Sequence, residues 1–426
     1  MKQKWWLLGV VLSVSMGHAQ AWVSELLKHP SVQAAQLQVR AAQAQVDGLN
    51  SPVTLVGQSN FQSSDFLDAP AGVPAGQWPQ DSSSWDATLT AAFKLFPYGD
   101  AADQLAQAQL GVQQAQLGFR SALTAAQVQV MSAAYQLQLA QQGKALAQSA
   151  EQLAFKSLEV ARLRASKGGI SPAELRDSEN AYQQAQEQLK AADENIRLAE
   201  LNLSLWVGNQ KVEIPENLKY PTSALSAEQQ SALFAREQTR IQVEGIKRRF
   251  LPVLNASYTY QLDDNNFLIA SLDSGSLQPA LTYNYQSKPA QTQVLNSQIK
   301  VGLKFTLTPS IADALSAADA QMAAADLNVK NAARSRELQE ASLKVRHEQA
   351  QRQLVLKSQA VSNATLALSE AQKREELGLN SPLQTLKAIL DLSQAQLAER
   401  QAKLDVLSRT LDVYRFYALP PIEVNP

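Results

Sequence analysis

Few side chains in this sequence are suited to chemistry. The 426 residues include no Cys and three His, at positions 18, 29 and 347. The lack of Cys excludes disulfides, thiolate metal sites, Cys nucleophiles and a lipid on an N-terminal Cys. His347 stands between Arg346 and Glu348, which favours a solvated helix face over a metal ligand. No phosphate-binding loop, nucleophile elbow or paired-carboxylate site is present in the sequence, and we expect no enzyme activity, cofactor or metal.

The polar residues that do stand out lie in two similar turns. The motif GGISP at 168–172 recurs as GLNSP at 378–382. In each copy a Ser precedes Pro and is followed three residues later by Glu174 or Gln384, which is the pattern of a helix capping box with Pro at the first helical position. We therefore predict that Ser171 and Ser381 are N-caps, each contributing about 1 kcal/mol.

Composition and charge exclude a further class. The chain is 45% apolar and 18% charged, with 38 basic and 39 acidic residues. Removing Lys2 and Lys4 with a leader peptide leaves 38 − 2 = 36 basic against 39 acidic residues. A nucleic-acid-binding domain is normally strongly basic, so no nucleic-acid partner is expected. Long stretches rich in Ala, Gln and Leu indicate long helices instead.

The first 21 residues have the pattern of a secretory signal. Lys2 and Lys4 precede an apolar stretch at 5–14, and Ala19-Gln20-Ala21 is an A-x-A cleavage site. The alternative, a membrane anchor, is disfavoured because about ten apolar residues are too few to cross a ~30 Å hydrocarbon layer. No later segment has the ~18 consecutive apolar residues of a spanning helix. We predict cleavage after Ala21, which makes Trp22 the first mature residue.

The chain is predicted to contain one unit twice. Pro97 lies 71 residues before Gly168, and Pro309 lies 69 residues before Gly378. Each unit is predicted as helix, strand, strand, helix, helix, with helices at 25–50, 100–167, 172–207, 227–250, 311–377 and 382–417. A helix of roughly 65 residues is about 100 Å long, so two shorter helices placed end to end match it. The predicted domains are a signal peptide (1–21), a first repeat (22–207), a linker (208–225), a second repeat (226–420) and a short tail (421–426).

Four segments alternate apolar and polar residues with period two, at 53–62, 85–95, 254–262 and 299–307. Each is close to the 9–11 residues of a membrane-crossing strand. A soluble half-buried sheet also alternates, but nothing else in the chain is expected to form a second layer. Four strands are too few to close a barrel, so we expect the chain to oligomerise, and three copies would give twelve strands. The intervening segments 63–83 and 263–290 are predicted as loops exposed outside the cell.

In this order and spacing, the chain resembles the TolC-like outer-membrane efflux family. The residues that carry the resemblance are the two-fold repeat, the Gly turns and the motifs His29-Pro30, Pro52, Leu251-Pro252 and Phe96-Pro97-Tyr98-Gly99. The resemblance implies an α+β membrane protein of the outer membrane. It implies a homotrimer with a 12-stranded β-barrel continuous with a long α-helical tunnel in the periplasm, working with a periplasmic adaptor protein and an inner-membrane pump.

The resemblance also implies roles for particular residues. The two turns would form the periplasmic tip that meets the adaptor: Lys167, Gly168, Gly169, Ile170, Leu377, Gly378, Leu379 and Asn380. Family members commonly carry acidic residues where this chain has Gln384 and Lys387, which suggests a neutral or cationic constriction. Glu174 retains an acid and is a candidate partner for Lys387, although a solvated surface charge is an equal reading of Lys387. On the strands, Lys94, Lys300 and Lys304 are expected to face the barrel lumen and attract anions, unless Asp86 or lipid phosphates neutralise them.

The sequence therefore predicts a passive channel of a tripartite efflux pump or a type I secretion system. Two alternatives remain. A periplasmic adaptor also has a long helical hairpin, but it would carry a single hairpin and a Gly-rich β module. A periplasmic coiled-coil scaffold would explain the helices but not the strands. Exporters of drugs, metals and polypeptides share this pattern, so it selects no substrate.

Overall fold

The structure is a computed structural model that describes residues 20–65, 82–94, 98–215, 218–223, 225–287, 296–305 and 309–422. Most of the predicted leader, the middle of the first predicted loop, the Phe96-Pro97 dipeptide and the last four residues lie outside this described part. The chain forms two compact units. Unit 1 comprises Met1–Leu37, Leu117–Glu228 and Ala333–Pro426, and unit 2 comprises Gln38–Gln116 and Gln229–Ala332.

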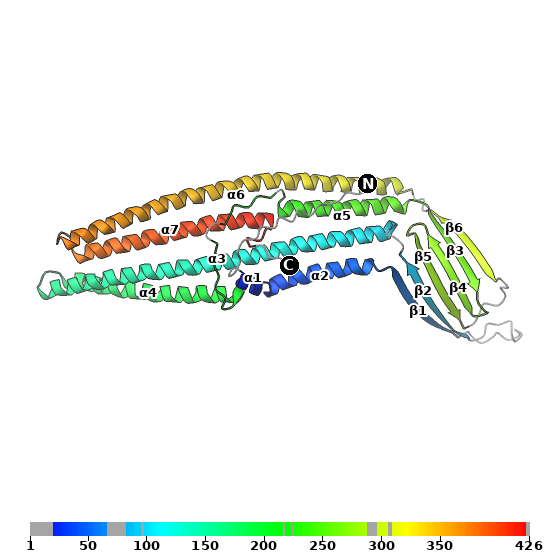
Figure 1. Cartoon of the computed structure of the whole chain (residues 1–426), viewed down its shortest axis with the longest axis horizontal. Coiled ribbons are helices and arrows are strands. Elements are labelled where there is room, and N and C mark those ends of the chain that lie inside the picture. The colour runs from blue at the N-terminus through cyan, green and yellow to red at the C-terminus, as the bar shows by residue number, and fades with distance from the viewer. Residues whose placement is uncertain are drawn as a thin grey trace. The chain divides into compact units, whose positions relative to one another are not determined.

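The predicted helices are present with nearly the predicted ends (Figure 1). The two longest, α3 and α6, have 68 and 66 residues. Their bounds and those of the shorter helices are α3 Gly99–Ser166, α4 Pro172–Val207, α5 Ala227–Arg249, α6 Ile311–Glu376 and α7 Pro382–Tyr417. Pro and Gly mark most of these ends, because Pro lacks the N–H that a helix interior needs and Gly tolerates the left-handed backbone that ends a helix.

The first predicted helix is wrong in one respect. In place of one helix at 25–50 there are two, α1 Gln20–Leu26 and α2 Pro30–Leu49, separated by three residues. Pro30 is the first residue of α2, and a Pro disfavours helical backbone at the residue before it. That residue, His29, stacks its ring on Trp206 of α4 at a centroid distance of 4.4 Å. The break therefore follows from the His29-Pro30 motif.

The core of unit 1 joins segments that are far apart in the sequence. Trp22 and Leu26 of α1 pack with Met131 of α3, Leu411 of α7 and Ile422, which follows α7. The fully buried Gln127 side chain binds the backbone of Ile422 twice, as donor to its carbonyl and acceptor from its N–H, both at 2.9 Å. Part of the predicted C-terminal tail is thus fixed to α3.

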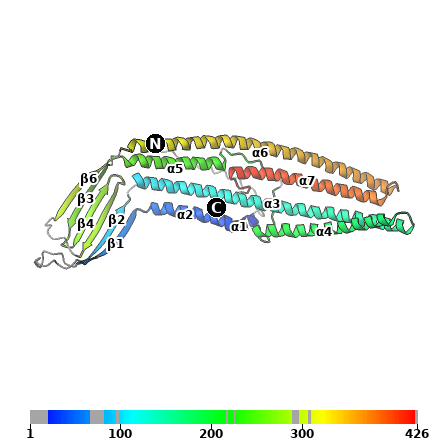
Figure 2. The ribbon, with the colours of Figure 1, turned by 180° about the vertical axis from the view of Figure 1, so that it is seen from behind.

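Unit 1 also contains two antiparallel helical hairpins, one of α4 with the later part of α3 and one of α7 with the later part of α6 (Figure 2). The hairpins lie side by side, because α3 contacts α7. Gln142 donates to Gln396 at 3.3 Å, and the hydroxyls of Ser149 and Ser393 are 3.4 Å apart. Many small Ala side chains along these helices allow the close approach.

Unit 2 contains an antiparallel six-stranded sheet in the order β1-β2-β5-β4-β3-β6 (Figure 1). Its strands are β1 Val53–Ser64, β2 Ser82–Phe93, β3 Val253–Gln261, β4 Asn266–Asp273, β5 Gln278–Gln286 and β6 Ser297–Lys304. The predicted pairs β1–β2 and β3–β6 are confirmed. The loop predicted at 263–290 is wrong, because it contains the β4–β5 hairpin, and the second repeat has four strands instead of two.

Two kinds of contact hold the helices of unit 2 together. Val46 of α2 packs on Ala108 and Val112 of α3. Basic residues of α5 form ion pairs with acidic residues of the neighbouring long helices: Arg248 with Asp103 of α3, Lys247 with Asp319 of α6 at 2.9 Å, and Arg236 with Asp326 of α6.

Candidate functional site

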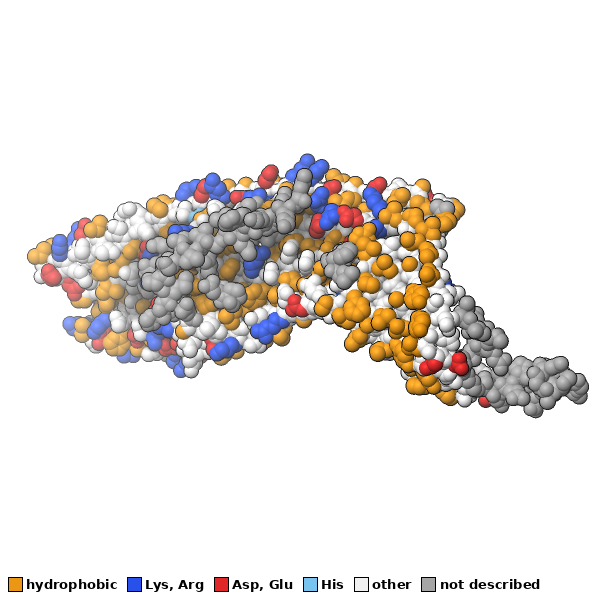
Figure 3. All heavy atoms as spheres, turned by 45° about the vertical axis from the view of Figure 1, so that its right-hand side comes forward, with side chains coloured by type: hydrophobic (Ala, Val, Ile, Leu, Met, Phe, Trp, Pro, Cys, Tyr) orange, Lys and Arg blue, Asp and Glu red, His pale blue; other side chains and the backbone are white. Residues whose placement is uncertain are grey.

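The sheet has one apolar and one polar face. The register aligns the apolar residues of all six strands: Leu55 is opposite Ala91, Leu89 opposite Tyr283, Leu268 opposite Tyr260, and Tyr258 opposite Ile299. These side chains are exposed in the chain, with Leu55 at 68% and Ile299 at 74%. Figure 3 shows the hydrophobic side chains gathered over the strands. A contiguous exposed apolar face of this size indicates contact with lipid or with another protein.

The polar face contains two of the three predicted lumen lysines. Lys300 pairs with Ser257, and Lys304 pairs with Val253 on the same face. Polar residues of β3 and β4 and Lys300 line a shallow hollow of about 530 Å³ in this face. One face of the sheet thus carries polar and cationic side chains, while the other carries apolar side chains.

Lys94 differs from the other two lysines. It follows the last residue of β2, and its Nζ donates to the carbonyl of Leu49 at the end of α2, at 3.2 Å. A cation at a helix C-terminus is stabilised by the partial negative charge there. Asp86 is eight residues away along β2, or about 26 Å, so it does not neutralise Lys94 within the chain.

The two predicted turns have the same backbone geometry. Gly168 and Gly378 have φ of +75° and +72°, the left-handed conformation that favours Gly. In the first turn the N–H of Gly169 donates to Arg164, and in the second the N–H of Leu379 donates to Arg374. Both are 6→1 helix C-caps that end α3 and α6.

The side chains of the predicted adaptor-contact residues are largely accessible. Lys167, Gly168, Gly169, Leu377, Gly378 and Leu379 are exposed, while Ile170 and Asn380 are half-buried. Leu377 and Leu379 have exposed fractions of 73% and 72%. Two large apolar side chains exposed on one short turn are suited to a hydrophobic contact with a partner.

Ser171 and Ser381 occupy the predicted N-cap positions, with a side-chain cap bond at Ser171 and none at Ser381. The Glu174 carboxylate accepts from the N–H of Ser171 at 2.8 Å and from its hydroxyl at 3.1 Å, and the Glu174 N–H donates to that hydroxyl. These bonds from Ser171 lower the pKa of Glu174 below its ordinary value. Gln384 accepts from the N–H of Ser381 at 3.0 Å.

The predicted pairing of Glu174 with Lys387 does not occur within the described chain. Lys387 is exposed on α7 and makes no ion pair with any residue that the structure describes. Glu174 is held instead by the turn in which it lies, because a partner three residues away in the sequence is available without ordering a second side chain. Glu174 of the same chain therefore does not neutralise a charge that Lys387 contributes to a constriction.

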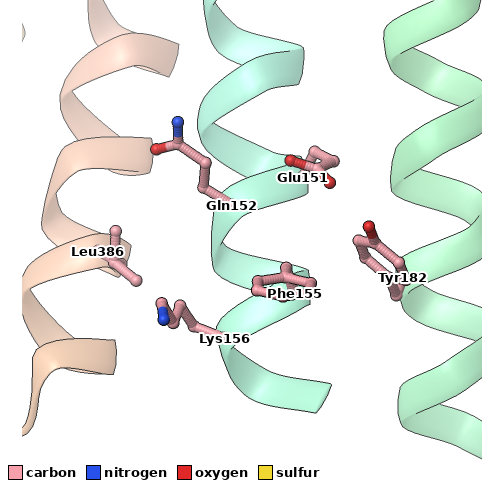
Figure 4. A pocket seen from close by; sticks show the side chains of 6 residues that line it. All are labelled: Glu151, Gln152, Phe155, Lys156, Tyr182 and Leu386. Atoms are coloured by element: carbon pink, nitrogen blue, oxygen red, sulfur yellow. The ribbon is translucent and has the colours of Figure 1, made fainter. Parts of the chain in front are cut away.

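A hollow of about 370 Å³ lies between α3, α4 and α7 in unit 1 (Figure 4). Phe155 of α3 contacts Tyr182 of α4 with ring centroids 5.5 Å apart, and Leu386 of α7 lies on the opposite side of α3 (Figure 4). Sequence reasoning missed this hollow, because its residues come from three helices.

His347, expected on a solvated helix face, is half-buried. Its ring packs edge-on against Tyr220 of the linker with a centroid distance of 5.0 Å, and burial lowers its pKa. The neighbouring Arg336 donates to the carbonyl of Ser223, and Tyr414 donates to that of Lys219. The linker 208–225 is therefore attached to α6 and α7 by side chains that no local pattern marks. Gln127 is a second residue whose role had no signal in the sequence.

Comparison with known proteins identifies this arrangement. Residues 22–209 match the model of the outer membrane efflux protein family, nearly the extent of the predicted first repeat. The first part of the chain is therefore similar to outer membrane efflux proteins. No curated protein sequence matches the chain significantly. The matched family is one of outer membrane efflux proteins and not of enzymes, which agrees with the predicted outer-membrane location.

Solved structures extend the likeness in fold to nearly the whole chain. The Campylobacter jejuni CmeC outer membrane channel is 14% identical with a TM-score of 0.66, over 94% of this chain and 85% of that one. The outer membrane protein VceC of Vibrio cholerae is 17% identical with a TM-score of 0.64, over 94% and 96%. The Neisseria gonorrhoeae MtrE outer membrane channel, in its open state, is 15% identical with a TM-score of 0.64, over 96% and 94%. At these identities the likeness establishes the fold.

No helix among the described residues is apolar over a length that would span a membrane. The described His, Asp and Glu residues include no cluster of three suited to holding a metal ion.

Proposed function

We propose that three copies of this protein form a passive channel through the outer membrane, as one component of a tripartite efflux pump or a type I secretion system. The observation that carries the proposal is the register of the sheet, which places apolar side chains on one face and Lys300 and Lys304 on the other. An open sheet edge in lipid leaves backbone groups unsatisfied at a cost of several kcal/mol each. The exposed edge strands β1 and β6 therefore favour closure between copies.

The two turns are proposed as the contact with a periplasmic adaptor. The support is the equivalence of their backbones and the exposure of Leu377 and Leu379. Replacing both Leu by Ser should abolish adaptor co-purification without changing trimer formation, since neither side chain supports the fold. The matched control is Leu356→Ser, which changes a similarly exposed Leu, 63% accessible, in the middle of α6.

The tunnel is proposed to narrow near Glu174, Gln384 and Lys387. Three Lys387 side chains brought towards one axis would repel one another, and this repulsion is not relieved by Glu174 within the chain. Lys387→Glu should shift the ion selectivity of single channels in a planar bilayer towards cations. Lys190→Glu on α4 is the control. Glu174→Gln should raise conductance by loosening the first turn. Unchanged currents in both variants would place the constriction elsewhere.

The channel itself is tested by location and assembly. The protein should fractionate with the outer membrane, migrate as a heat-sensitive trimer on gels and form ion-conducting pores. A soluble monomer would instead support the periplasmic scaffold or adaptor alternative. Deleting the gene and comparing drug susceptibility with the secreted proteins separates a pump from a secretion system.

A further inference from the structure

The β4–β5 hairpin lies inside the sheet, between β2 and β3. β5 pairs with β2 over seven residues, from Asp86 opposite Gln286 to Ala92 opposite Ala280. β4 pairs with β3 from Asn255 opposite Asp273 to Gln261 opposite Phe267. The hairpin therefore spans almost the full length of β3. We propose that it is a membrane-spanning part of the barrel wall, so that each chain supplies six strands and three copies form a barrel of eighteen.

The hairpin has apolar side chains on the same face of the sheet as its neighbours, as a membrane-spanning barrel strand would. Leu272, Leu281 and Tyr283 are on the apolar face of the sheet, with exposed fractions of 45%, 41% and 41%. Ser271 and Thr282 are on the polar face, which also carries Phe267 and Ile269 of β4. A hairpin in the aqueous lumen or outside the cell has no need of an apolar stripe in register with its neighbours. A strand that faces hydrocarbon on one side and water on the other requires such alternation, and β5 has it throughout.

The turn of the hairpin is fixed at the end of the sheet where α3 begins. The Asp273 carboxylate accepts from the N–H groups of Gly275 and Ser276, and Leu254 of β3 exchanges two hydrogen bonds of 2.8 Å with Ser274. A Cβ on Gly99, which begins α3 with φ of +59°, would collide with the carbonyl of Gly275. These contacts hold the turn on the wall.

Strand direction is compatible with closure. All five pairings are antiparallel, so the two edge strands of one chain, β1 and β6, run in opposite directions. Edge β6 of one copy can therefore pair antiparallel with β1 of the next. Inserting a hairpin between β2 and β3 preserves this alternation, whereas a single strand would break it. Barrel diameter grows roughly linearly with strand number, so eighteen strands give a lumen about one and a half times as wide as twelve.

The inference rests on the proposed trimeric channel, and the absence of native Cys allows a cross-linking test in that assembly. Thr90 of β2 and Thr282 of β5 are directly opposed, with hydroxyls 3.0 Å apart. In the same row, Thr259 of β3 is three strand spacings from Thr90, about 14 Å, which is too far for a disulfide. If β2 and β3 paired directly in a twelve-stranded barrel, these two residues would be neighbours.

We expect T90C/T282C to form an intrachain disulfide in oxidised outer membranes, identified by peptide mass spectrometry, and T90C/T259C to remain reduced. Linkage of T90C/T259C, or of neither pair, would overturn the inference. Trimer mobility and pore formation are measured on the same samples. Intact trimers and pores with the wrong linkage refute the inference alone, whereas their absence in the wild type refutes the proposed channel as well.

A second pair of variants does not depend on disulfide formation. Leu281→Arg places a charge on the lipid face of β5, and Thr282→Arg places it on the polar face one residue along. Leu281→Arg should reduce the yield of assembled trimer at least tenfold, while Thr282→Arg should assemble normally. Equal yields would show that the hairpin lies outside the membrane, because only a wall strand distinguishes its two faces in this way.

Discussion

The contact of Gln127 with the C-terminal segment gives a prediction with a magnitude. Gln127→Leu keeps the approximate size of the side chain but removes both hydrogen bonds to Ile422. Each neutral hydrogen bond contributes about 1 kcal/mol net, and each backbone group left buried without a partner costs about 1–3 kcal/mol. Because the segment can partly detach and become hydrated, we expect a loss of about 2–4 kcal/mol in the free energy of docking. That loss is roughly a 30- to 700-fold increase in the open population.

Hydrogen exchange measures this population directly, because amide exchange follows the local opening equilibrium. The Ile422 N–H should exchange roughly 30 to 700 times faster in Gln127→Leu than in the wild type. Gln142→Leu is the matched control on the same helix, since it removes a single, half-buried bond of 3.3 Å to Gln396. Exchange within a factor of two of wild type, or equal to the control, would refute the argument and show that apolar packing alone holds the segment.

Three further predictions follow from single contacts. Glu174 stabilises the start of α4 while it is ionised, and its pKa is lowered from 4.5. Protection of that turn from proteolysis should therefore be complete at neutral pH and should fall as the pH drops through the lowered pKa. Glu174→Gln should remove this pH dependence. Gly168→Ala should destabilise the first turn by about 1 kcal/mol in thermal melts, because Ala disfavours a φ of +75°. Gly111→Ala, inside α3 with open space around it, should be neutral or stabilising in the same melts. Asp103→Asn should weaken the ion pair with Arg248, whose side chain is 30% exposed, by about 1–3 kcal/mol. Faster protease cleavage between α5 and β3 would report this loss, and an unchanged cleavage rate would contradict the prediction.

The sequence alone determined the helices and the character of the strands. Helix ends such as Pro172 and Pro382 were predictable because Pro and Gly constrain the backbone locally, whatever surrounds them. Ser171 was predictable as a cap for the same reason. The period-two segments also predicted which residues share a face, since alternation is a property of any extended strand.

The tertiary structure decided what depends on partners distant in the sequence. The β4–β5 hairpin was missed because Ser, Gly, Asp and Pro in the segment 263–290 favour a loop. Its strands are recognisable only from their pairing with β2 and β3. Its alternation becomes a continuous apolar face only once the register is fixed. His347 became a packed residue because Tyr220, more than 120 residues earlier, covers it. Neighbouring residues determine the local backbone preference, whereas burial and strand pairing depend on contacts that form only in the folded chain.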